Sequence, residues 1–211
     1  MRTTIIGGPT GVEEAAFGLG LSYGLTSNMA IEDFMHSAQF TKCMNVMTKL
    51  SHQQGGHNKF LESIVVWLDI TAPRFSWQEF DTYRVGVTKQ SESTIHTIKS
   101  RPLEQADFEY HLPDEVLDVF NLNLPSMELP AIKNQLPEGF LQRRIVCINL
   151  KTLQNMWYQR KNHKLPQWHT FFDDLNKGLS YSWCKTSVRY WIFKNEKDEY
   201  INVESDENSF N

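Results

Sequence analysis

The sequence has little cysteine, and what it has is scattered. Cys43, Cys147 and Cys184 are the three cysteines among 211 residues, and none stands in a Cys-x-x-Cys pair or at a spacing typical of zinc ligands. This distribution excludes a disulfide framework and a zinc-binding motif. It favours a reducing compartment, and we expect no metal site.

Long apolar runs and an excess of positive charge are absent too. No apolar run approaches the roughly 18 residues that cross a bilayer, and the N-terminus lacks a basic segment followed by an apolar core. The formal net charge is -4, whereas general binding to nucleic acid needs a basic face that displaces phosphate counterions. We therefore expect a cytoplasmic protein, or one in the host cytoplasm if a virus carries the gene, that binds neither membrane nor nucleic acid. The charge does not exclude a local anion pocket.

The composition is that of a folded chain. Hydrophobic residues make up 40% and aromatic residues 12%, and the length favours a single domain over residues 1–211. Residues 1–30 are rich in glycine and predict a flexible, turn-rich lead-in, in which Gly18 and Gly20 form no phosphate loop because no strand is predicted before them. The acidic residues 196–211 predict a mobile tail.

Hydrophobic periodicity and turn residues predict the main elements. These are an amphipathic helix over 31–50, a core strand over 64–71 that ends at Pro73, a polar loop over 84–94 that could cradle an anion, a proline-punctuated connection over 101–137 with a short helix over 114–120, and a helix that reaches residue 160.

The segment that ends at Arg160 carries the most informative pattern. Asn149 and Arg160 lie eleven positions apart, which at about 100° per residue places both side chains on nearly the same side of a helix. Leu150, Leu153 and Trp157 recur at helical spacing and predict that another side packs against a core. A polar row on a buried helix is suited to holding one planar polar ligand.

The same segment resembles the late motif of the flavin-dependent thymidylate synthases. That motif has a basic residue, a Leu-Pro pair, an Asn and an Arg at fixed spacing. The chain matches it without a gap at Lys133, Leu136, Pro137, Asn149 and Arg160, and the match extends to Lys151, Leu153 and Asn155.

A weaker resemblance lies upstream. Gly56–Ser63 is similar to the family's Gly-His-x-Ser-x-x-Glu-His, with Ser63 in place of the last His. Residues 79–95 are similar to its Gln-x-x-Arg-His-Arg and Ser-x-Asn-Glu-x-Ser-x-Arg signature, once one inserted residue is allowed. Of that signature, Arg84 and Ser93 are unchanged.

The departures concern the residues expected to hold phosphate and flavin. Thr82, Tyr83 and Ile95 stand where the family has Arg, His and Arg, and hydroxyls replace bidentate guanidinium contacts only weakly. Two interpretations stay open. Either another cation re-equips the pocket or the pocket has lost its ligand; the candidate cations are Lys89, Arg101 and Arg143.

The resemblance implies an α+β fold with helices packed on a β-sheet, and a homotetramer with sites between subunits. It implies reductive C5 methylation of dUMP, with FAD as cofactor and methylenetetrahydrofolate and NADPH as co-substrates. Arg160 would be the catalytic residue, since the matching Arg favours ionisation of the uracil ring at N3. The implied substrate-binding residues are Lys133, Glu79, Thr82, Ser91, Glu92 and Ser93, and the implied cofactor-binding residues are Tyr83, Arg84, Asn149, Lys151 and Asn155.

Alternatives remain at this point. The chain could be a non-catalytic nucleotide-binding or interaction protein with this fold, or a related enzyme that adds a different C5 substituent to a pyrimidine nucleotide. Residues 91–93 fit the start of a helix equally well, and the six tryptophans fit a core. Cys147 lies in an apolar context that makes a thiol unreactive, which disfavours the thymidylate synthases that attack the ring with a thiolate.

Overall fold

A four-stranded antiparallel sheet forms the centre of the protein. The structure is a computed structural model that describes residues 1–53, 55–180 and 183–193. The strands are β1 (Arg2–Thr10), β2 (Val65–Pro73), β3 (Val87–Ser91) and β4 (Leu141–Asn149), in the order β1-β2-β4-β3. The expected tail, 196–211, lies outside the described residues.

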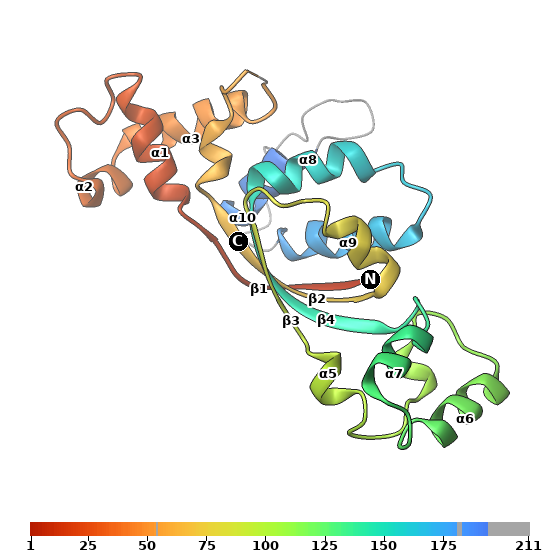
Figure 1. The fold of residues 1–211 in the computed structure, drawn as a ribbon. Coiled ribbons are helices and arrows are strands. Elements are labelled where there is room, and N and C mark those ends of the chain that lie inside the picture. Colours follow the sequence, from red (N-terminus) through yellow and green to blue (C-terminus); the bar gives the residue numbers. More distant parts are fainter. Residues whose placement is uncertain (54, 181–182, 194–211) are drawn as a thin grey trace, which may run out of the picture.

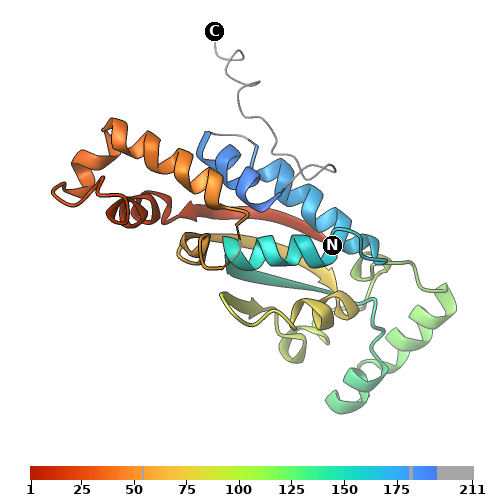
Figure 2. The same cartoon turned by 90° about the horizontal axis from the view of Figure 1, so that it is seen from above.

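Helices cover one face of the sheet and extend beyond both of its ends (Figures 1 and 2). α8, α9 and α10 lie over the sheet, α1 to α3 project at one end, and α5 to α7 form a lobe at the other. The helices are α1 (Val12–Leu21), α2 (Ile31–Met35), α3 (Ala38–Leu50), α4 (Arg74–Phe80), α5 (Thr94–Thr97), α6 (Asp114–Asn123), α7 (Leu129–Gln135), α8 (Leu150–Arg160), α9 (Pro166–Gly178) and α10 (Trp183–Ile192), with 3₁₀ turns η1 (Lys59–Glu62) and η2 (Gln105–Asp107). The predicted α+β class is confirmed.

Along the central strands, buried and exposed side chains alternate between the two faces of the sheet. In β2, Val66, Leu68 and Ile70 are fully buried under the helices, while Trp67 between them is 38% exposed on the other face. The exposed side of β1 carries Ile6. We call this second side, which β1, β2 and β4 share, the open face.

Two hydrophobic cores follow from this arrangement. The larger lies between the sheet and the helices and includes the fully buried Trp168 and Phe171 of α9. The smaller lies inside the α5–α7 lobe, where Leu117, Leu124 and Ile132 are buried. The single domain expected for residues 1–211 stays a prediction, because the lobe has a core of its own.

Several local expectations are wrong. Residues 1–30 are not a turn-rich lead-in, because β1 and α1 occupy most of them. Gly8 allows β1 to lie close to β2, because its φ is +83° and a Cβ there would lie 2.7 Å from the carbonyl oxygen of Val65 in β2. The polar loop expected over 84–94 contains the edge strand β3, which pairs with β4.

The other differences are smaller. The helix expected over 31–50 divides into α2 and α3 at residues 36–37. β2 ends at Pro73 as predicted, and the short helix predicted over 114–120 is present as α6. The proline-punctuated connection also contains α7, which starts with Pro130 in its first turn, where a missing N–H costs little.

The alternation makes a prediction about stability. Replacing Leu68 by Ala should lower the free energy of unfolding by about 2–5 kcal/mol, because it leaves a cavity in a fully buried site. Gln90→Ala, on an exposed position of β3, should change it by less than about 0.5 kcal/mol. Denaturant titration of both variants measures the difference, and equal losses would contradict the assignment of the two faces.

Candidate functional site

Helix α8 begins directly at the end of β4. Asn149 is the last residue of the strand and the N-cap of the helix, and its Oδ1 accepts a hydrogen bond of 2.9 Å from the backbone N–H of Thr152. Leu150 and Leu153 are fully buried, as their spacing predicted. The first turn of α8 is therefore fixed by a cap and by the core.

A loop between α4 and β3 lies along this helix. The carbonyl of Gly86 accepts from the N–H of Asn149 at 2.9 Å, and the carbonyl of Val85 accepts from the hydroxyl of Thr152 at 2.7 Å. The Tyr83 hydroxyl donates to Gln159 at 2.8 Å. Residues 83–86 thus meet both ends of α8, with Tyr83 at the C-terminal end and Gly86 beside Asn149 at the N-terminal end. The predicted cofactor residue Arg84 lies in the same loop and is exposed.

The side chain of Arg160, the predicted catalytic residue, is held near the end of α8. Its Nε donates to the Tyr83 hydroxyl at 3.1 Å, and its Nη1 lies 3.2 Å from Oε2 of Glu79. The same Glu79 oxygen accepts from the indole N–H of Trp168 at 2.7 Å, and the guanidinium stands 5.2 Å from the centre of that ring. His163 contacts the guanidinium as well.

Two further predicted cofactor residues lie on α8. Asn155 is exposed, whereas the Lys151 side chain turns toward the chain segment before β2 and donates to Oδ1 of Asn58 at 2.7 Å. Burial lowers the pKa of the Lys151 amine below its usual value. Asn58 also donates to the fully buried Gln154, so this part of α8 belongs to an internal amide network.

A hollow opens near the segment similar to Gly-His-x-Ser. Its volume is about 510 Å³, and it lies between α1, α3 and η1. His57 and Lys59 line it together with Leu19 and Phe60. The structure thus places His57 at an exposed hollow rather than in the core.

The predicted substrate-binding residues divide between two places. Glu79 lies with Arg160, and the Thr82 hydroxyl turns back to the carbonyl of Glu79 at 2.7 Å. Lys133 of α7 donates to the hydroxyl of Thr94 in α5. The exposed residues Ser91, Glu92 and Ser93 come immediately before α5, with Ser93 at the N-cap position but without a side-chain cap bond.

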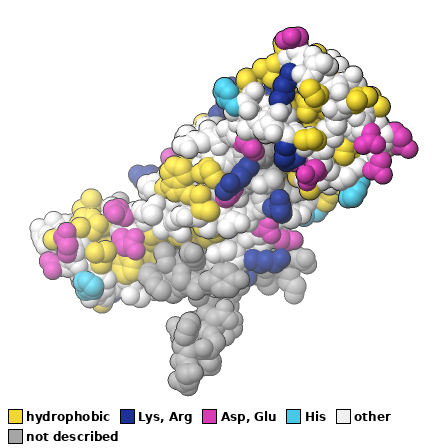
Figure 3. Space-filling view, turned by 90° about the horizontal axis from the view of Figure 1, so that it is seen from below, with side chains coloured by type: hydrophobic (Ala, Val, Ile, Leu, Met, Phe, Trp, Pro, Cys, Tyr) yellow, Lys and Arg dark blue, Asp and Glu magenta, His cyan; other side chains and the backbone are white. Residues whose placement is uncertain are grey.

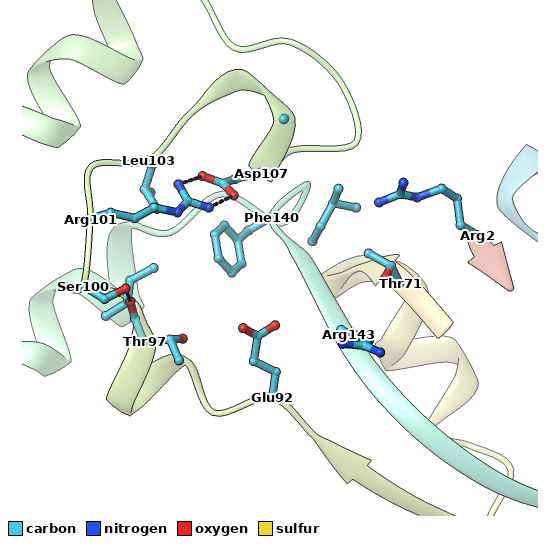
Figure 4. A pocket seen from close by; sticks show the side chains of 13 residues that line it. Arg2, Thr71, Glu92, Thr97, Ser100, Arg101, Leu103, Asp107, Phe140 and Arg143 are labelled. Carbon is cyan, nitrogen blue, oxygen red and sulfur yellow. Dashed lines mark hydrogen bonds and ion pairs between the residues drawn. The ribbon is translucent and has the colours of Figure 1, made fainter. Parts of the chain in front are cut away.

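A cavity of about 270 Å³ lies between the open face of the sheet and the α5–α7 lobe (Figure 4). The Phe140 ring forms part of its wall, and the Glu92 carboxylate and the Arg101 guanidinium lie on either side of that ring in the view (Figure 4). The other polar residues of the lining are Thr97, Ser100 and Asp107 from the lobe and Arg2, Thr71 and Arg143 from the sheet.

The three cations that could replace the lost phosphate ligands lie in two different places. Arg101 and Arg143 line it. Lys89 does not, because its ammonium lies 2.9 Å from Asp81 and close to the Phe80 ring on the helix side. The structure therefore places two of the three candidates in one cavity.

The cavity and Arg160 lie on opposite sides of the sheet. Neighbouring residues of β4 point to opposite faces. The Arg144 guanidinium lies 4.2 Å from the centre of the buried Trp77 ring, on the side of the helices, so Arg143 points to the open face. Arg160 belongs to α8 on the side of the helices. One copy of the chain does not bring both guanidiniums to the same ligand.

Some residues of these two places had no sequence signal. Arg2 reaches the cavity from the segment expected to be a turn-rich lead-in, and Thr97 and Ser100 reach it from residues 95–100, for which no element was predicted. Nothing in their local pattern distinguishes these three residues. Trp168 has a weak sequence signal, because Gln167-Trp168 is similar to the family's Gln-Trp-Glu, although it stands one residue later than in the family and His169 replaces the Glu.

Substitution of Gly86 tests how closely the loop over 83–86 packs against the start of α8. A Cβ at this position would lie 2.2 Å from Nδ2 of Asn149, and the φ of Gly86 is +69°. Gly86→Ala should displace the Asn149 side chain and lower the free energy of unfolding by roughly 1–3 kcal/mol through loss of the cap and backbone strain.

Gly139→Ala is the matched control, since no atom lies within 4 Å of a Cβ built there. Chemical denaturation compares the two alanine variants. A Gly86→Ala protein as stable as the Gly139→Ala protein would contradict the close packing of the loop on Asn149.

Comparison with known proteins gives a clear result for structure alone. No protein-family model and no curated protein matches the sequence. A flavin-dependent thymidylate synthase of Helicobacter pylori, complexed with FAD and dUMP, superimposes with a TM-score of 0.67 at 16% identity over 94% of this chain and 98% of that one. Another structure of the H. pylori enzyme with FAD and dUMP gives 0.61 at 17% identity over 83% and 94%.

A third match is PolB from Streptomyces cacaoi, a UMP/dUMP methylase bound to 5-Br dUMP. Its TM-score is 0.59 at 12% identity, over 91% of this chain and 95% of that one. These likenesses extend over most of both chains in each comparison. The chain therefore has the fold of the flavin-dependent thymidylate synthases.

Proposed function

We propose that the protein is a divergent flavin-dependent enzyme that methylates C5 of dUMP reductively, with methylenetetrahydrofolate as carbon donor and NADPH as reductant. One observation carries the proposal. The two motif segments meet in space where Glu79 and Tyr83, 81 and 77 residues earlier in the sequence, bind the side chain of Arg160. In a scaffold without a ligand there is no reason for both motif remnants to converge on one guanidinium.

The surroundings of Arg160 support its proposed role on a pyrimidine ring. Its Nε and Nη1 are occupied, and among the described residues Nη2 has no partner, so this nitrogen is available to a ligand. Its side chain is only 20% exposed. A fixed cation that is shielded from water stabilises the negative charge that develops when a uracil loses its N3 proton, and this charge makes C5 nucleophilic.

The residues beside the loop fit a flavin cofactor. Arg84 and Asn155 are exposed hydrogen-bond donors, and the Tyr83 hydroxyl contacts Arg160. This donor set suits the diphosphate and the polar ring edge of FAD. Bound there, FAD would supply the hydride of the reaction. Oδ1 of Asn149 already accepts the hydrogen bond of the helix cap, and its Nδ2 can donate to the cofactor.

We propose that the complete site forms between copies of the chain in a homotetramer. The cavity and Arg160 lie on opposite sides of one sheet, so their joint use requires a second copy. The open face offers an apolar contact surface, with Trp67 38% and Ile6 53% exposed. Figure 3 shows hydrophobic side chains gathered beside charged ones on the underside of the sheet.

A non-catalytic nucleotide-binding protein is the second candidate. The contact between Arg160 and Glu79 favours it, because the carboxylate offsets part of the positive charge that would stabilise a uracil anion. An enzyme that adds another C5 substituent shares the geometry of the first candidate and would differ in its carbon donor.

Activity distinguishes these candidates. Wild-type protein supplied with FAD, NADPH, methylenetetrahydrofolate and dUMP tritiated at C5 should release tritium. Arg160→Ala should release tritium at least about 100-fold more slowly than wild type. Arg160→Lys should be nearly as slow as Arg160→Ala, because an ammonium cannot reproduce the planar contacts of a guanidinium. Release from folded wild-type protein no faster than from Arg160→Ala would exclude the methylation and leave the binding protein or an enzyme with a different carbon donor.

The assembly has its own test. Trp67→Glu should reduce the mass measured by light scattering below that of a tetramer, because a charge is placed on an apolar contact surface. Leu122→Glu, on a residue that is 80% exposed on α6 and away from the sheet, should leave the mass unchanged. A wild-type protein that is monomeric at micromolar concentration would overturn the proposal of a site between copies.

A further inference from the structure

Helix α6, at the outer end of the α5–α7 lobe (Figure 1), is apolar on two sides. One side buries Leu117 and Leu124 in the core of the lobe. The other side carries Val116, Val119 and Leu122, which are 49%, 59% and 80% exposed. A helix that is apolar on both sides is normally covered on both. The described chain leaves the second side of α6 open to solvent.

A groove runs along this second side of α6. Its volume is about 500 Å³, and Gln135 of α7 closes it on one flank. The residues of α6 that line it recur every three or four positions and are Glu115, Val116, Val119, Phe120 and Asn123. Residues 115–123 span about two helical turns, or roughly 12 Å. A groove of this length accepts the apolar anchors of another helix, which recur at the same spacing.

The groove lies in a strongly acidic part of the chain. Residues 102–132 contain seven acidic residues and neither lysine nor arginine. Glu115 lines the groove, and Asp118 follows one turn further along α6. Both are exposed, and within the part of the chain that the structure describes neither has an ion-pair partner. The apolar stripe is therefore flanked by unpaired negative charge.

This charge decides which occupant fits the groove. Two copies of α6 that paired symmetrically would bring Glu115 and Asp118 of each copy close to those of the other, and such like-charge contacts are unfavourable. Nucleic acids and anionic lipid surfaces carry the same sign of charge and are repelled. Residues 196–211 of the chain itself are acidic as well. A complementary surface has lysine or arginine beside an apolar stripe.

We infer that α6 is a docking site for a basic amphipathic helix of another protein. Apolar side chains of that helix enter the groove against Val116 and Val119, and its cations lie beside Glu115 and Asp118. One groove of two helical turns buries a small area, so the partner binds transiently. The inference goes beyond the proposed function, because none of these residues contacts Arg160 or lines the cavity.

Fluorescence anisotropy of a labelled peptide, titrated with the full chain, tests the docking site. The probe is a synthetic peptide of about 18 residues, or about five helical turns, with leucine at helical spacing on one face and lysine on the others. Val119→Glu should raise its dissociation constant at least about 10-fold, because a carboxylate would be buried under leucine side chains. The control Leu21→Glu makes the same kind of change at a 56% exposed residue of α1, at the opposite end of the molecule, and should alter the constant less than about twofold.

A second variant tests the charge and leaves the apolar groove intact. Glu115→Gln combined with Asp118→Asn should raise the dissociation constant of the basic peptide about 2- to 10-fold, through the loss of two exposed charge contacts. The same variant should weaken the dependence of binding on salt concentration. A peptide with glutamate in place of every lysine should bind the wild type at least about 10-fold more weakly than the basic peptide does.

Three outcomes would overturn the inference. The first is a wild type that does not bind the basic peptide. The second is equal binding by the wild type and by Val119→Glu protein with native circular dichroism. The third is a lower mass of Val119→Glu in light scattering, which would assign α6 to a contact between copies of the chain. Tritium release should be the same in Val119→Glu and wild type, so failure of the docking site and failure of the proposed enzyme are separate results.

Discussion

The junction of β4 and α8 at Asn149 is the constraint on which the rest of the structure depends. The strand passes into the helix without a loop, so the helix axis and the strand direction are fixed relative to each other by one capped residue. The central pairing of β2 with β4 runs without a shift from Val65 to Pro73 and holds the strand in register. The junction therefore fixes where α8, and with it Arg160, lies relative to the sheet.

The part of the fold that sequence patterns predict is the part that local periodicity determines. β2 is a run of β-branched and aromatic residues that ends at a proline, and α8 carries Leu150 and Leu153 at helical spacing. Both segments lie in the main core, where the pattern of burial is strong enough to decide the secondary structure. The prediction that Asn149 and Arg160 share one helical face is wrong, because Asn149 is the extended N-cap of α8 and its side chain turns to Thr152, while Arg160 lies at the other end of the helix. Both residues nevertheless meet the loop over 83–86.

The edges of the sheet could not be predicted this way. β1 contains Gly7, Gly8 and Pro9, which favour turns, and it becomes a strand because β2 offers unpaired backbone groups along its whole length. β3 is polar because it lies at the opposite edge, where its side chains are partly exposed. The cavity depends on these edges and on the α5–α7 lobe. Its residues are therefore near one another only through tertiary contacts that no local pattern encodes.

The strict alternation of β4 has a consequence for how this protein can change over time. Arg143 and Arg144 are neighbours in sequence, yet one faces the cavity and the other lies over a buried tryptophan. Inserting or deleting a single residue in the strand would exchange their environments and turn Val146 and Ile148 outward as well. Divergence in this strand is thus confined to replacement of side chains at constant length, while changes in length are left to segments such as the connection between α6 and α7.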